Sequence, residues 1–412
     1  MKKLLISLSS VFVPFSVSLS VVACNNNETS GQTTTDNPKE PENPSNPQTP
    51  SEPNNPGTNT NPGSNPNNPQ TPTEPENPVV PENPSEPEGW SKNKLLIGYW
   101  YDWGGNYQIK INFNEIDDSY NVINLSFLYA QTANAMPIFQ PSNPTEVKNG
   151  IKYLHSKNKK VLISMGGQTG EGMRFNENQK SDLKQTISNV VKEYDLDGID
   201  LDWEGSCLAD RTSQKVTSEA LIEIKNEWAK QNKHFFISMA PELPYLKEST
   251  EASGNSYIPF FKQLDKYYDW INPQCYNGWA YGPYVDQEEA TELGLGYGSV
   301  ITNDDYANRG IFYYLMTKYL TTKKSNLNGF YLIDPNKFVL GASTNEPAGR
   351  GAAYEGAINK FYELTKQNNI NIRGLMTWAL NYDGYDGPIE NAGQTTWKKW
   401  SFAKWFRDTF AK

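Results

Sequence analysis

Four carboxylates lie within eight residues of this 412-residue chain, at Asp197, Asp200, Asp202 and Glu204. Apolar residues that suit a β-strand alternate with them, which a solvated acidic patch would not show. In a strand, side chains two residues apart share a face. Asp200, Asp202 and Glu204 are therefore predicted to point one way. The residues between them are predicted to point the other way: Ile199, Leu201 and Trp203.

Three acids on one face of a buried strand are costly unless they share protons or meet a ligand. Their mutual repulsion should raise the pKa of at least one of them, as a general acid working near neutrality requires. We therefore interpret the stretch as a catalytic strand, with Glu204 at its carboxyl end as proton donor. The alternatives are a surface edge strand and a loose cation site. Trp203 is interpreted as a packing residue that faces the surrounding helices.

Strand-like runs alternate with helical ones from residue 89 onward, and the acidic stretch is the fourth strand. The other strands are expected at 95–100, 122–129, 160–165, 235–240, 270–276, 338–343 and 374–380. Helices are expected near 145–155, 181–194, 216–230, 259–268, 310–320, 351–366 and 396–410, and a loop at 277–309. This alternation predicts an α/β fold, a (β/α)8 TIM barrel. The runner-up is an open doubly wound sheet, but the sequence lacks the Gly-rich phosphate-binding turn expected after its first strand.

The carboxyl ends of the predicted strands carry further polar and aromatic residues, and in such barrels the chemistry sits at these ends. Strand three ends Ser164-Met165-Gly166-Gly167, and strand five ends Met239-Ala240-Pro241-Glu242. Strand six ends Gln274-Cys275-Tyr276-Asn277, and strand eight reads Gly374-Leu375-Met376-Thr377-Trp378.

The acidic stretch reads D-x-x-D-x-D-x-E and resembles the signature of glycoside hydrolase family 18, the chitinase family. The end of strand three is similar to the family's S-x-G-G motif, and the end of strand six to its Q-x-Y-N variant. Strand eight is similar to the family segment whose Trp floors the sugar site. The resemblance extends over all eight strands of residues 95–380. It implies a chitinase that cuts β-1,4-linked N-acetylglucosamine chains.

The resemblance also implies a substrate-assisted, retaining mechanism instead of the two-carboxylate scheme. Glu204 would protonate the glycosidic oxygen while the substrate's own 2-acetamido oxygen attacks C1. Asp202 would hold the acetamido N–H, Asp200 would share a proton with Asp202, and Tyr276 would donate to the acetamido oxygen. Asp197 has the opposite parity to Glu204 and is expected to support the start of the strand. No cofactor and no metal are implied.

A sugar ring has an apolar face of C–H groups that an aromatic plane covers well. Trp378 fits this need, and Tyr99, Trp103 and Trp279 lie near other strand ends. For Trp103 and Trp279, core packing is the alternative. Further substrate-binding residues are expected at the ends of strands five and six: Met239, Gln274 and Asn277.

Two other functions compete with the chitinase hypothesis. An endo-β-N-acetylglucosaminidase of the same family, acting on N-glycan cores, would use identical chemistry. An inactive carbohydrate-binding protein would belong to a different class, but such members typically lack the terminal Glu, and Glu204 is present. Many chitinases carry an inserted α+β module between strands seven and eight. The segment 343–374 leaves room for little beyond one helix, which favours a shallow groove and endo-type cleavage.

The first 24 residues have the pattern of a bacterial export signal. Lys2 and Lys3 precede an apolar run that ends in Val21-Val22-Ala23-Cys24. This ending resembles a lipoprotein signal, in which Cys24 becomes the lipidated amino end. The alternative is an ordinary signal peptide, or an uncleaved anchor, with an incidental cysteine. The expected location is the bacterial cell surface, with the protein lipid-anchored to the membrane.

Residues 25–88 are interpreted as a disordered linker that separates this signal from a catalytic domain at 89–412. Sixteen of the 28 prolines lie between Pro38 and Pro87, most of them three residues apart. Polyproline II has three residues per turn, so these prolines would line one edge of an extended rod. The intervening polar residues cannot build a core. The rod would hold the catalytic domain away from the membrane.

Charge and composition exclude several classes of function. The net charge is −10, and the predicted linker holds ten acidic residues and one lysine, so the catalytic domain is nearly neutral. A nucleic-acid partner is therefore not expected. His155 and His234 are the only histidines, which disfavours a soft-metal site and a Ser-His-Asp triad. Whether Cys207 and Cys275 pair stays open at this stage.

Overall fold

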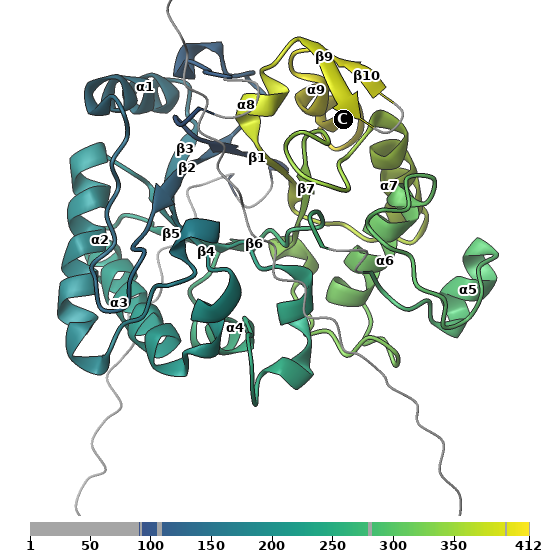
Figure 1. The fold of residues 1–412 in the computed structure, drawn as a ribbon, viewed down its shortest axis with the longest axis horizontal. Helices are drawn as coiled ribbons and strands as arrows, with labels where there is room; N and C mark the ends of the chain where they lie inside the picture. The colour runs from purple at the N-terminus through teal and green to yellow at the C-terminus, as the bar shows by residue number, and fades with distance from the viewer. Residues whose placement is uncertain (1–89, 91–92, 105–108, 279–281, 392–393, 412) are drawn as a thin grey trace, which may run out of the picture. The chain divides into compact units, whose positions relative to one another are not determined.

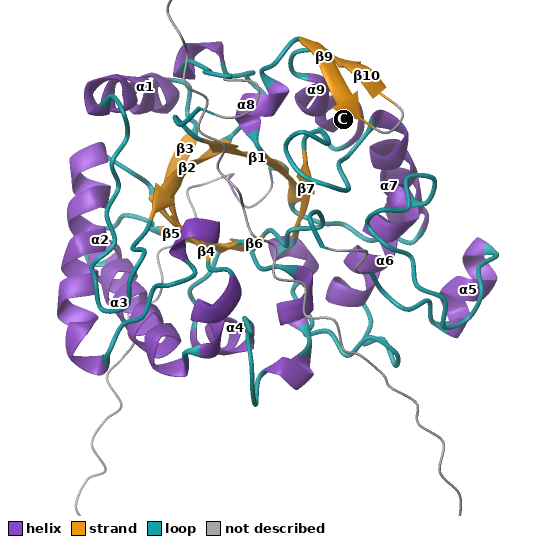
Figure 2. Ribbon diagram, viewed as in Figure 1, coloured by secondary structure: helices purple, strands orange, loops and turns teal. Residues whose placement is uncertain are grey.

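The computed structural model describes residues 90, 93–104, 109–278, 282–391 and 394–411. The predicted signal with Cys24, the predicted linker and the candidate sugar-binding residue Trp279 lie outside the described residues. Figure 1 and Figure 2 show a ring of strands surrounded by helices. Within the described ranges, no helix is both long enough and apolar enough to cross a membrane.

Eight parallel strands form one sheet in the order β6-β5-β4-β3-β2-β1-β8-β7. Their bounds are β1 (Leu95–Trp100), β2 (Val122–Leu128), β3 (Lys160–Gly166), β4 (Gly198–Asp202), β5 (Phe236–Met239), β6 (Trp270–Ile271), β7 (Val339–Ser343) and β8 (Gly374–Trp378). All eight predicted strands are present, and all but β6 extend over most of the predicted length.

Strand β6 is shorter than the predicted 270–276. Pro273 lacks a backbone N–H and cannot donate to the ladder, so regular pairing stops after Ile271. Beyond the break, Gln274 forms an isolated parallel bridge with Gly341 of β7. The N–H of Cys275 donates to the carbonyl of Gly341 at 2.9 Å. The barrel is therefore nearly closed between β6 and β7, and the predicted (β/α)8 fold is confirmed.

Helices cover the outside of the barrel (Figure 1). They are α1 (Pro144–Ser156), α2 (Lys180–Tyr194), α3 (Arg211–Ala229), α4 (Ile258–Gln263), α5 (Gln287–Leu293), α6 (Arg309–Thr321), α7 (Glu355–Gln367), α8 (Leu380–Asp383) and α9 (Ser401–Thr409). The predicted final helix 396–410 begins too early, because a hairpin of β9 (Gly387–Asn391) and β10 (Gln394–Trp397) comes first.

Helix α5 lies inside the segment 277–309, which the sequence analysis expects to be a loop. Its Glu289 is fully buried, and Lys318 and Lys323 of the α6 region lie 2.7 and 3.0 Å from that carboxylate. The hydroxyl of Tyr319 donates to it at 2.9 Å. These partners offset the cost of burying the charge. The short helix is thus held by contacts that are distant in sequence, which a local pattern does not reveal.

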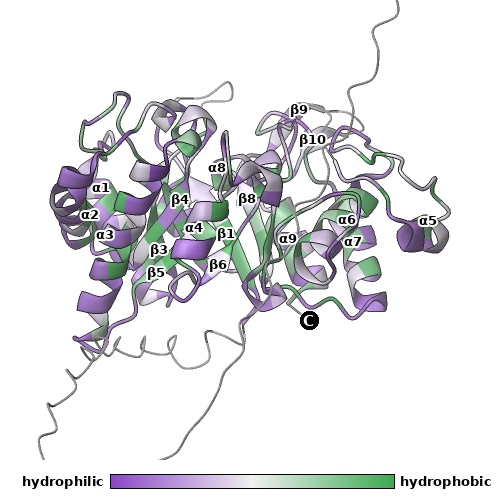
Figure 3. Cartoon of the chain, turned by 90° about the horizontal axis from the view of Figure 1, so that it is seen from below, coloured by the Kyte–Doolittle hydropathy of each residue, from purple (hydrophilic) through white to green (hydrophobic). Residues whose placement is uncertain are grey.

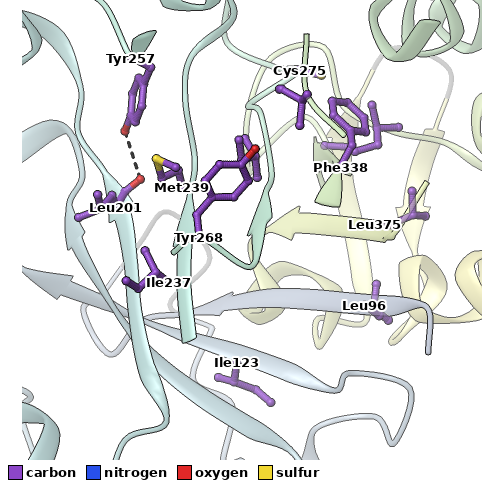
Figure 4. Packing of buried hydrophobic residues seen from close by; sticks show 14 of the residues in the cluster. Leu96, Ile123, Leu201, Ile237, Met239, Tyr257, Tyr268, Cys275, Phe338 and Leu375 are labelled. Atoms are coloured by element: carbon purple, nitrogen blue, oxygen red, sulfur yellow. Dashed lines mark hydrogen bonds between the residues drawn. The ribbon is translucent and has the colours of Figure 1, made fainter. Parts of the chain in front are cut away.

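Alternation along the strands divides the apolar residues into two cores. Residues that face outward pack between strands and helices, and Figure 4 labels Leu96, Ile123, Leu201 and Ile237 among them. Residues that face inward fill the barrel: Leu95, Ile97, Val122, Leu162, Phe236, Val339 and Met376. Figure 3 shows the strands largely hydrophobic, with hydrophilic stretches on the surrounding helices. The polar residues of the barrel interior, among them Asp200 and Asp202, lie toward the carboxyl ends of the strands.

Candidate active site

Strand β4 presents its acids with the predicted alternation. Asp200 and Asp202 are buried at the inner face of the strand, and Glu204 follows directly after its end. The strand pairs with β3 on one side and with β5 on the other, so the alternative of an edge strand is wrong. The apolar residues of the stretch pack outward in the core beneath the helices: Ile199, Leu201 and Trp203.

The two glycines at the end of β3 let this strand approach β4 closely. The N–H of Gly167 donates to the carbonyl of Asp202 at 2.7 Å. Gly166 has a φ of +129°, and a Cβ there would lie 2.1 Å from the same carbonyl oxygen. Only glycine fits this position. The close approach also brings Ser164 of β3 beside the acids.

Asp200 is fully buried and accepts three hydrogen bonds. The donors are the hydroxyls of Tyr99 at 2.6 Å, Ser238 at 2.7 Å and Ser164 at 2.8 Å. Asn272 in turn donates to the Tyr99 hydroxyl at 3.1 Å. Burial raises the pKa of Asp200, and the three donors hold that rise back by favouring the charged form.

Asp202 and Glu204 are joined through one amide. The Nε2 group of Gln274 donates to Asp202 Oδ1 at 2.8 Å and to Glu204 Oε1 at 3.2 Å. Within the part of the chain that the structure describes, no hydrogen bond joins Asp200 to Asp202. The proton that Asp200 and Asp202 are expected to share stays a prediction, while the Gln274 amide joins Asp202 to Glu204.

Burial and like charge raise the proton affinity of the acids. Burial raises the pKa of Glu204 to about 7, with further contributions from the charges of Glu242 and Glu171 and an opposing one from the Gln274 hydrogen bond. The pKa of Asp202 is raised well above its usual range by burial and by the charges of Glu204, Asp200 and Glu242. Glu204 thus holds its proton up to about neutral pH, as a general acid must.

Tyr276 follows the break in β6 and is almost completely buried. Burial, together with the charges of Asp202 and Glu204, raises the pKa of its hydroxyl well above the ordinary value of 10.0. The hydroxyl therefore stays protonated and can act only as a neutral donor or acceptor.

An aromatic group lies at the carboxyl ends of β1, β2 and β8. The ring of Trp378 stacks on Phe127, with centroids 5.7 Å apart and an interplanar angle of 11°. Tyr101 stacks on Trp378 at 6.0 Å and on Trp103 at 4.6 Å. Trp103 is 43% exposed, and Trp378 is partly exposed. Both rings thus retain surface that an apolar sugar face could cover.

Two of the predicted sugar-binding residues, Tyr99 and Met239, have other surroundings than expected. Tyr99 is buried, and its hydroxyl is engaged by Asp200 and Asn272. Met239 points outward, because its neighbour Ser238 takes the inner position opposite Asp200; Figure 4 shows Met239 beside Leu201. The prediction that Met239 binds sugar is therefore wrong, because its side chain lies on the outer face of β5.

Asn277 is exposed and ties two loops of the catalytic face together. It has a φ of +58°, and its Oδ1 accepts from the backbone N–H of Arg350 at 2.9 Å. Its own N–H donates to the Arg350 carbonyl at 2.8 Å. Its side-chain oxygen therefore holds the segment after β7 in place.

Sequence reasoning missed several residues that surround the acids. Ser238 and Asn272 bind Asp200 and Tyr99, and Phe127 and Tyr101 support Trp378. The register Ser164↔Asp200↔Ser238 places these serines in one layer of the barrel. Ser238 can be recognised from the sequence as a site residue only if the register between β4 and β5 is known.

The described cysteines form no disulfide, and the described acids form no metal-binding group. Cys207 and Cys275 are buried free thiols, so the pairing left open by the sequence does not occur. In the ranges that the structure describes, no group of three or more His, Cys, Asp or Glu side chains is arranged to hold a metal ion.

Barrels of this class carry their reactions at the carboxyl ends of the strands, and a protonated carboxyl beside an aromatic plane is suited to glycoside cleavage. The chain matches the model of the glycosyl hydrolases family 18 over residues 95–370 and belongs to that family. It is a glycoside hydrolase of the chitinase-like type.

Two curated relatives and one solved structure illustrate the similarity. A chitinase of Enterococcus faecalis is 30% identical over 306 residues, which cover 71% of this chain and 82% of that one. Chitinase D of Niallia circulans is 25% identical, and the match covers 72% of this chain but 60% of that relative. A family 18 chitinase from Chromobacterium violaceum has a TM-score of 0.56 at 21% identity, covering 71% and 81% of the two chains, and supports the fold.

Proposed function

We propose that the protein hydrolyses the β-1,4 linkages of chitin by substrate-assisted, retaining catalysis. The observation that carries the proposal is the amide of Gln274, which binds Asp202 at 2.8 Å and Glu204 at 3.2 Å. It holds both carboxyls on one side of the strand end. The names of the relatives favour chitin as substrate.

The geometry favours the acetamido group of the substrate as nucleophile. In the ordinary retaining route one carboxylic acid protonates the leaving group, while a second carboxylate attacks C1 from the opposite face. Asp202 and Glu204 are two residues apart and share the Gln274 amide, so both would meet the same side of a bound sugar. The acetamido group is already tethered beside C1, which gives it a high effective concentration.

The proposed roles follow from the surroundings of each side chain. Glu204 protonates the glycosidic oxygen and later activates water. Asp202 orients the acetamido N–H and offsets the positive charge that develops on the oxazolinium ion. Asp200 supports Asp202 electrostatically from the layer below, and the neutral hydroxyl of Tyr276 donates to the acetamido oxygen. Trp378 covers the apolar face of the sugar.

The short connection between β7 and β8 favours a shallow groove and endo-type cleavage. The segment between β7 and β8 contains α7 and short connections. It holds no inserted α+β module among its residues 344–373, all of which the structure describes. A long glycan could therefore cross the barrel without being threaded through a tunnel on this side.

The location at the cell surface is a separate proposal. It rests on the sequence of residues 1–24 and on the proline-rich segment that follows. A lipid on Cys24 would anchor the chain to the membrane, and the linker would let the catalytic domain reach polysaccharide outside the cell. The full-length protein expressed in bacteria should partition into detergent, and Cys24→Ala should move it to the aqueous phase. Equal partitioning of both forms would exclude the anchor.

Activity assays on two glycans test the catalytic proposal. The purified protein should release products from chitin oligomers, and it should leave the core of a high-mannose glycopeptide uncut. Preferential cleavage of the glycopeptide would instead identify an endo-β-N-acetylglucosaminidase. Binding of chitin oligomers without turnover of either glycan would identify an inactive carbohydrate-binding protein.

A further inference from the structure

The segment that carries Trp378 also holds the chain that leaves β1. Asn381 lies three residues after Trp378, in the short helix α8, and is fully buried. Its Oδ1 accepts a hydrogen bond from the backbone N–H of Tyr101 at 3.1 Å, and its Nδ2 donates to the Tyr101 carbonyl at 2.9 Å. The side-chain amide therefore pairs with Tyr101 as a neighbouring strand would, through one donor and one acceptor.

The same amide also binds the chain further along, at Ile109. Its Nδ2 donates to the carbonyl of Ile109 at 3.2 Å. Tyr101 precedes Trp103 in the sequence and Ile109 follows it, so Asn381 fastens the chain on both sides of this indole. Tyr101 and Ile109 are buried, and their backbone groups need partners inside the protein. Asn381 supplies these partners with a single side chain.

Gly98 lets helix α8 approach β1 closely enough for these bonds. A Cβ at Gly98 would lie 2.9 Å from the Cβ of Leu380 and 2.8 Å from the ring of Tyr120. A larger residue in this place would therefore push α8 away from the strand. Figure 1 shows α8 next to β1. The close packing of these two elements brings Asn381 to the backbone of Tyr101.

The position of Tyr101 affects how the aromatic rings at this end of the barrel are arranged. Its buried ring lies 6.0 Å from Trp378 and 4.6 Å from Trp103, at interplanar angles of 28° and 22°. The two indoles are 6.4 Å apart, with an angle of 31° between them. Phe127 contacts both indoles from β2, at 5.7 and 5.8 Å. Trp103 is the more exposed of the two indoles.

We propose that Asn381 is a positioning residue that fixes Tyr101 and, through it, holds Trp103 ready to bind the sugar next to the one on Trp378. The inference rests on the proposed function. A sugar ring that covers Trp378 leaves the neighbouring indole to the next ring of the chain. Ordering a loop during binding costs free energy. The amide of Asn381 orders this loop beforehand, so more of the contact with Trp103 contributes to affinity.

The test compares KM and kcat of the unaltered protein and Asn381→Ala on chitin oligomers of increasing length. Asn381→Ala should raise KM for long oligomers by about 3- to 10-fold, the size of one aromatic contact. The change in KM should be smaller for oligomers too short to reach Trp103. The kcat should stay within about threefold, because a contact made equally in the ground state and the transition state affects KM alone.

Two variants at Asn381 keep the test interpretable. The loop should stay attached in Asn381→Ala, because the indole of Trp100 still donates to the carbonyl of Ile111 at 3.0 Å. Circular dichroism should therefore report the same fold. If Asn381→Ala does not fold, Asn381→Asp replaces it. The carboxylate keeps the shape and the acceptor for the Tyr101 N–H but lacks the donors, so KM should rise in the same direction.

Asn328 provides a matched control. It is buried, its Oδ1 accepts from the backbone N–H of Tyr284 at 2.7 Å, and its Nδ2 donates to the Tyr284 carbonyl at 2.7 Å. Asn328→Ala therefore removes the same kind of two-way pairing from a segment outside the aromatic group. It should leave KM unchanged for oligomers of every length.

A double-mutant cycle with Trp103→Ala shows whether Asn381 acts through this indole. If it does, the KM of the double variant should match that of Trp103→Ala within about twofold, because Asn381 then has no indole left to position. An unchanged KM in Asn381→Ala, an equal rise in Asn328→Ala, or effects that multiply in the double variant would each overturn the inference. Failure of the proposed function would look different, because the unaltered protein would then neither cleave nor bind chitin oligomers.

Discussion

Asp197 and Asp269 occupy equivalent places at the amino-terminal end of the barrel. Asp197 directly precedes β4 and accepts from the backbone N–H of Val161 in β3 at 2.8 Å. Asp269 directly precedes β6 and accepts from the N–H of Ile237 in β5 at 2.8 Å. Each also binds one histidine and one lysine: His155 and Lys160, and His234 and Lys225. Both aspartates thus fasten one strand to its neighbour, far from the acids at the other end.

The Asp269 cluster should be the more important of the two for stability. Lys225 is 1% exposed and lies 2.8 Å from Asp269. Asp269→Asn would leave a buried ammonium group without its carboxylate, and breaking such a pair costs about 3–5 kcal/mol. The partners of Asp197 are partly exposed, so Asp197→Asn should lower the free energy of unfolding by only about 1 kcal/mol. Urea unfolding of both variants measures the difference, and equal costs would contradict this account.

The Asp197 cluster should make stability depend on pH in both directions. Burial alone would raise the pKa of Asp197, but the hydrogen bond from His155 and the charge of Lys160 outweigh it and lower the pKa below 3.8. The stability from this shift is present above about pH 4 and is lost as the pH falls through the lowered value. The hydrogen bond to Asp197 raises the pKa of His155 above 6.5, against the effect of burial. That stability is present below 6.5 and is lost as the pH rises through the raised value.

The difference in unfolding free energy between the unaltered protein and Asp197→Asn should therefore be largest at about pH 5–6. It should shrink as the pH falls through the lowered pKa of Asp197 and again as the pH rises through the raised pKa of His155. Denaturant titrations across this range provide the measurement. A difference that is independent of pH would show that the cluster acts through packing and not through charge.

Local sequence patterns are enough to predict much of this fold, but their predictions fail at particular residues. The alternation around Asp200 and the repeated strand–helix units depend on neighbours in sequence, and both were predictable. Met239 was assigned to the wrong face because the phase of β5 is set by its register with β4, where Ser238 lies opposite Asp200. Helix α5 was missed because it depends on lysines of the α6 region. Ser238 and Asn272 became recognisable as site residues only once three strands had been brought together.

Removing the proton of the acid should abolish turnover while leaving binding intact. Glu204→Gln keeps the shape of the side chain and a hydrogen-bonding group toward Gln274. Loss of general acid catalysis should lower kcat on chitin oligomers by a factor of about 10²–10⁴. Affinity for the oligomers, measured by calorimetry, should stay within about threefold, a change of less than 1 kcal/mol. A Gln variant with near-normal turnover would show that the proton donor lies elsewhere.

Two serines of one barrel layer provide a matched test of the Asp200 network. Ser238 donates to Asp200 at 2.7 Å, whereas the Oγ of the buried Ser126 has no hydrogen-bond partner among the described residues. A hydrogen bond to a charged group is worth about 1.5–3 kcal/mol. Ser238→Ala should therefore lower kcat by about 10- to 100-fold if the charge on Asp200 supports catalysis. Ser126→Ala should have little effect, and equal losses in both variants would instead indicate a packing defect.

The final prediction separates substrate assistance from a covalent enzyme intermediate. Asp202 and Glu204 share the amide of Gln274, so Asp202 is poorly placed to attack C1 from the face opposite the acid. If the acetamido oxygen attacks instead, a stable thiazoline mimic of the oxazolinium ion should bind much more tightly than the substrate, as species close to the transition state do. Oligomers that lack the N-acetyl group at the cleaved sugar should resist hydrolysis, and the β-anomer should appear first by NMR. Mass spectrometry should find no glycosyl adduct on Asp202. Efficient cleavage of a fully deacetylated oligomer, or a trapped adduct on Asp202, would rule out the proposed mechanism, because either result requires a nucleophile other than the acetamido group.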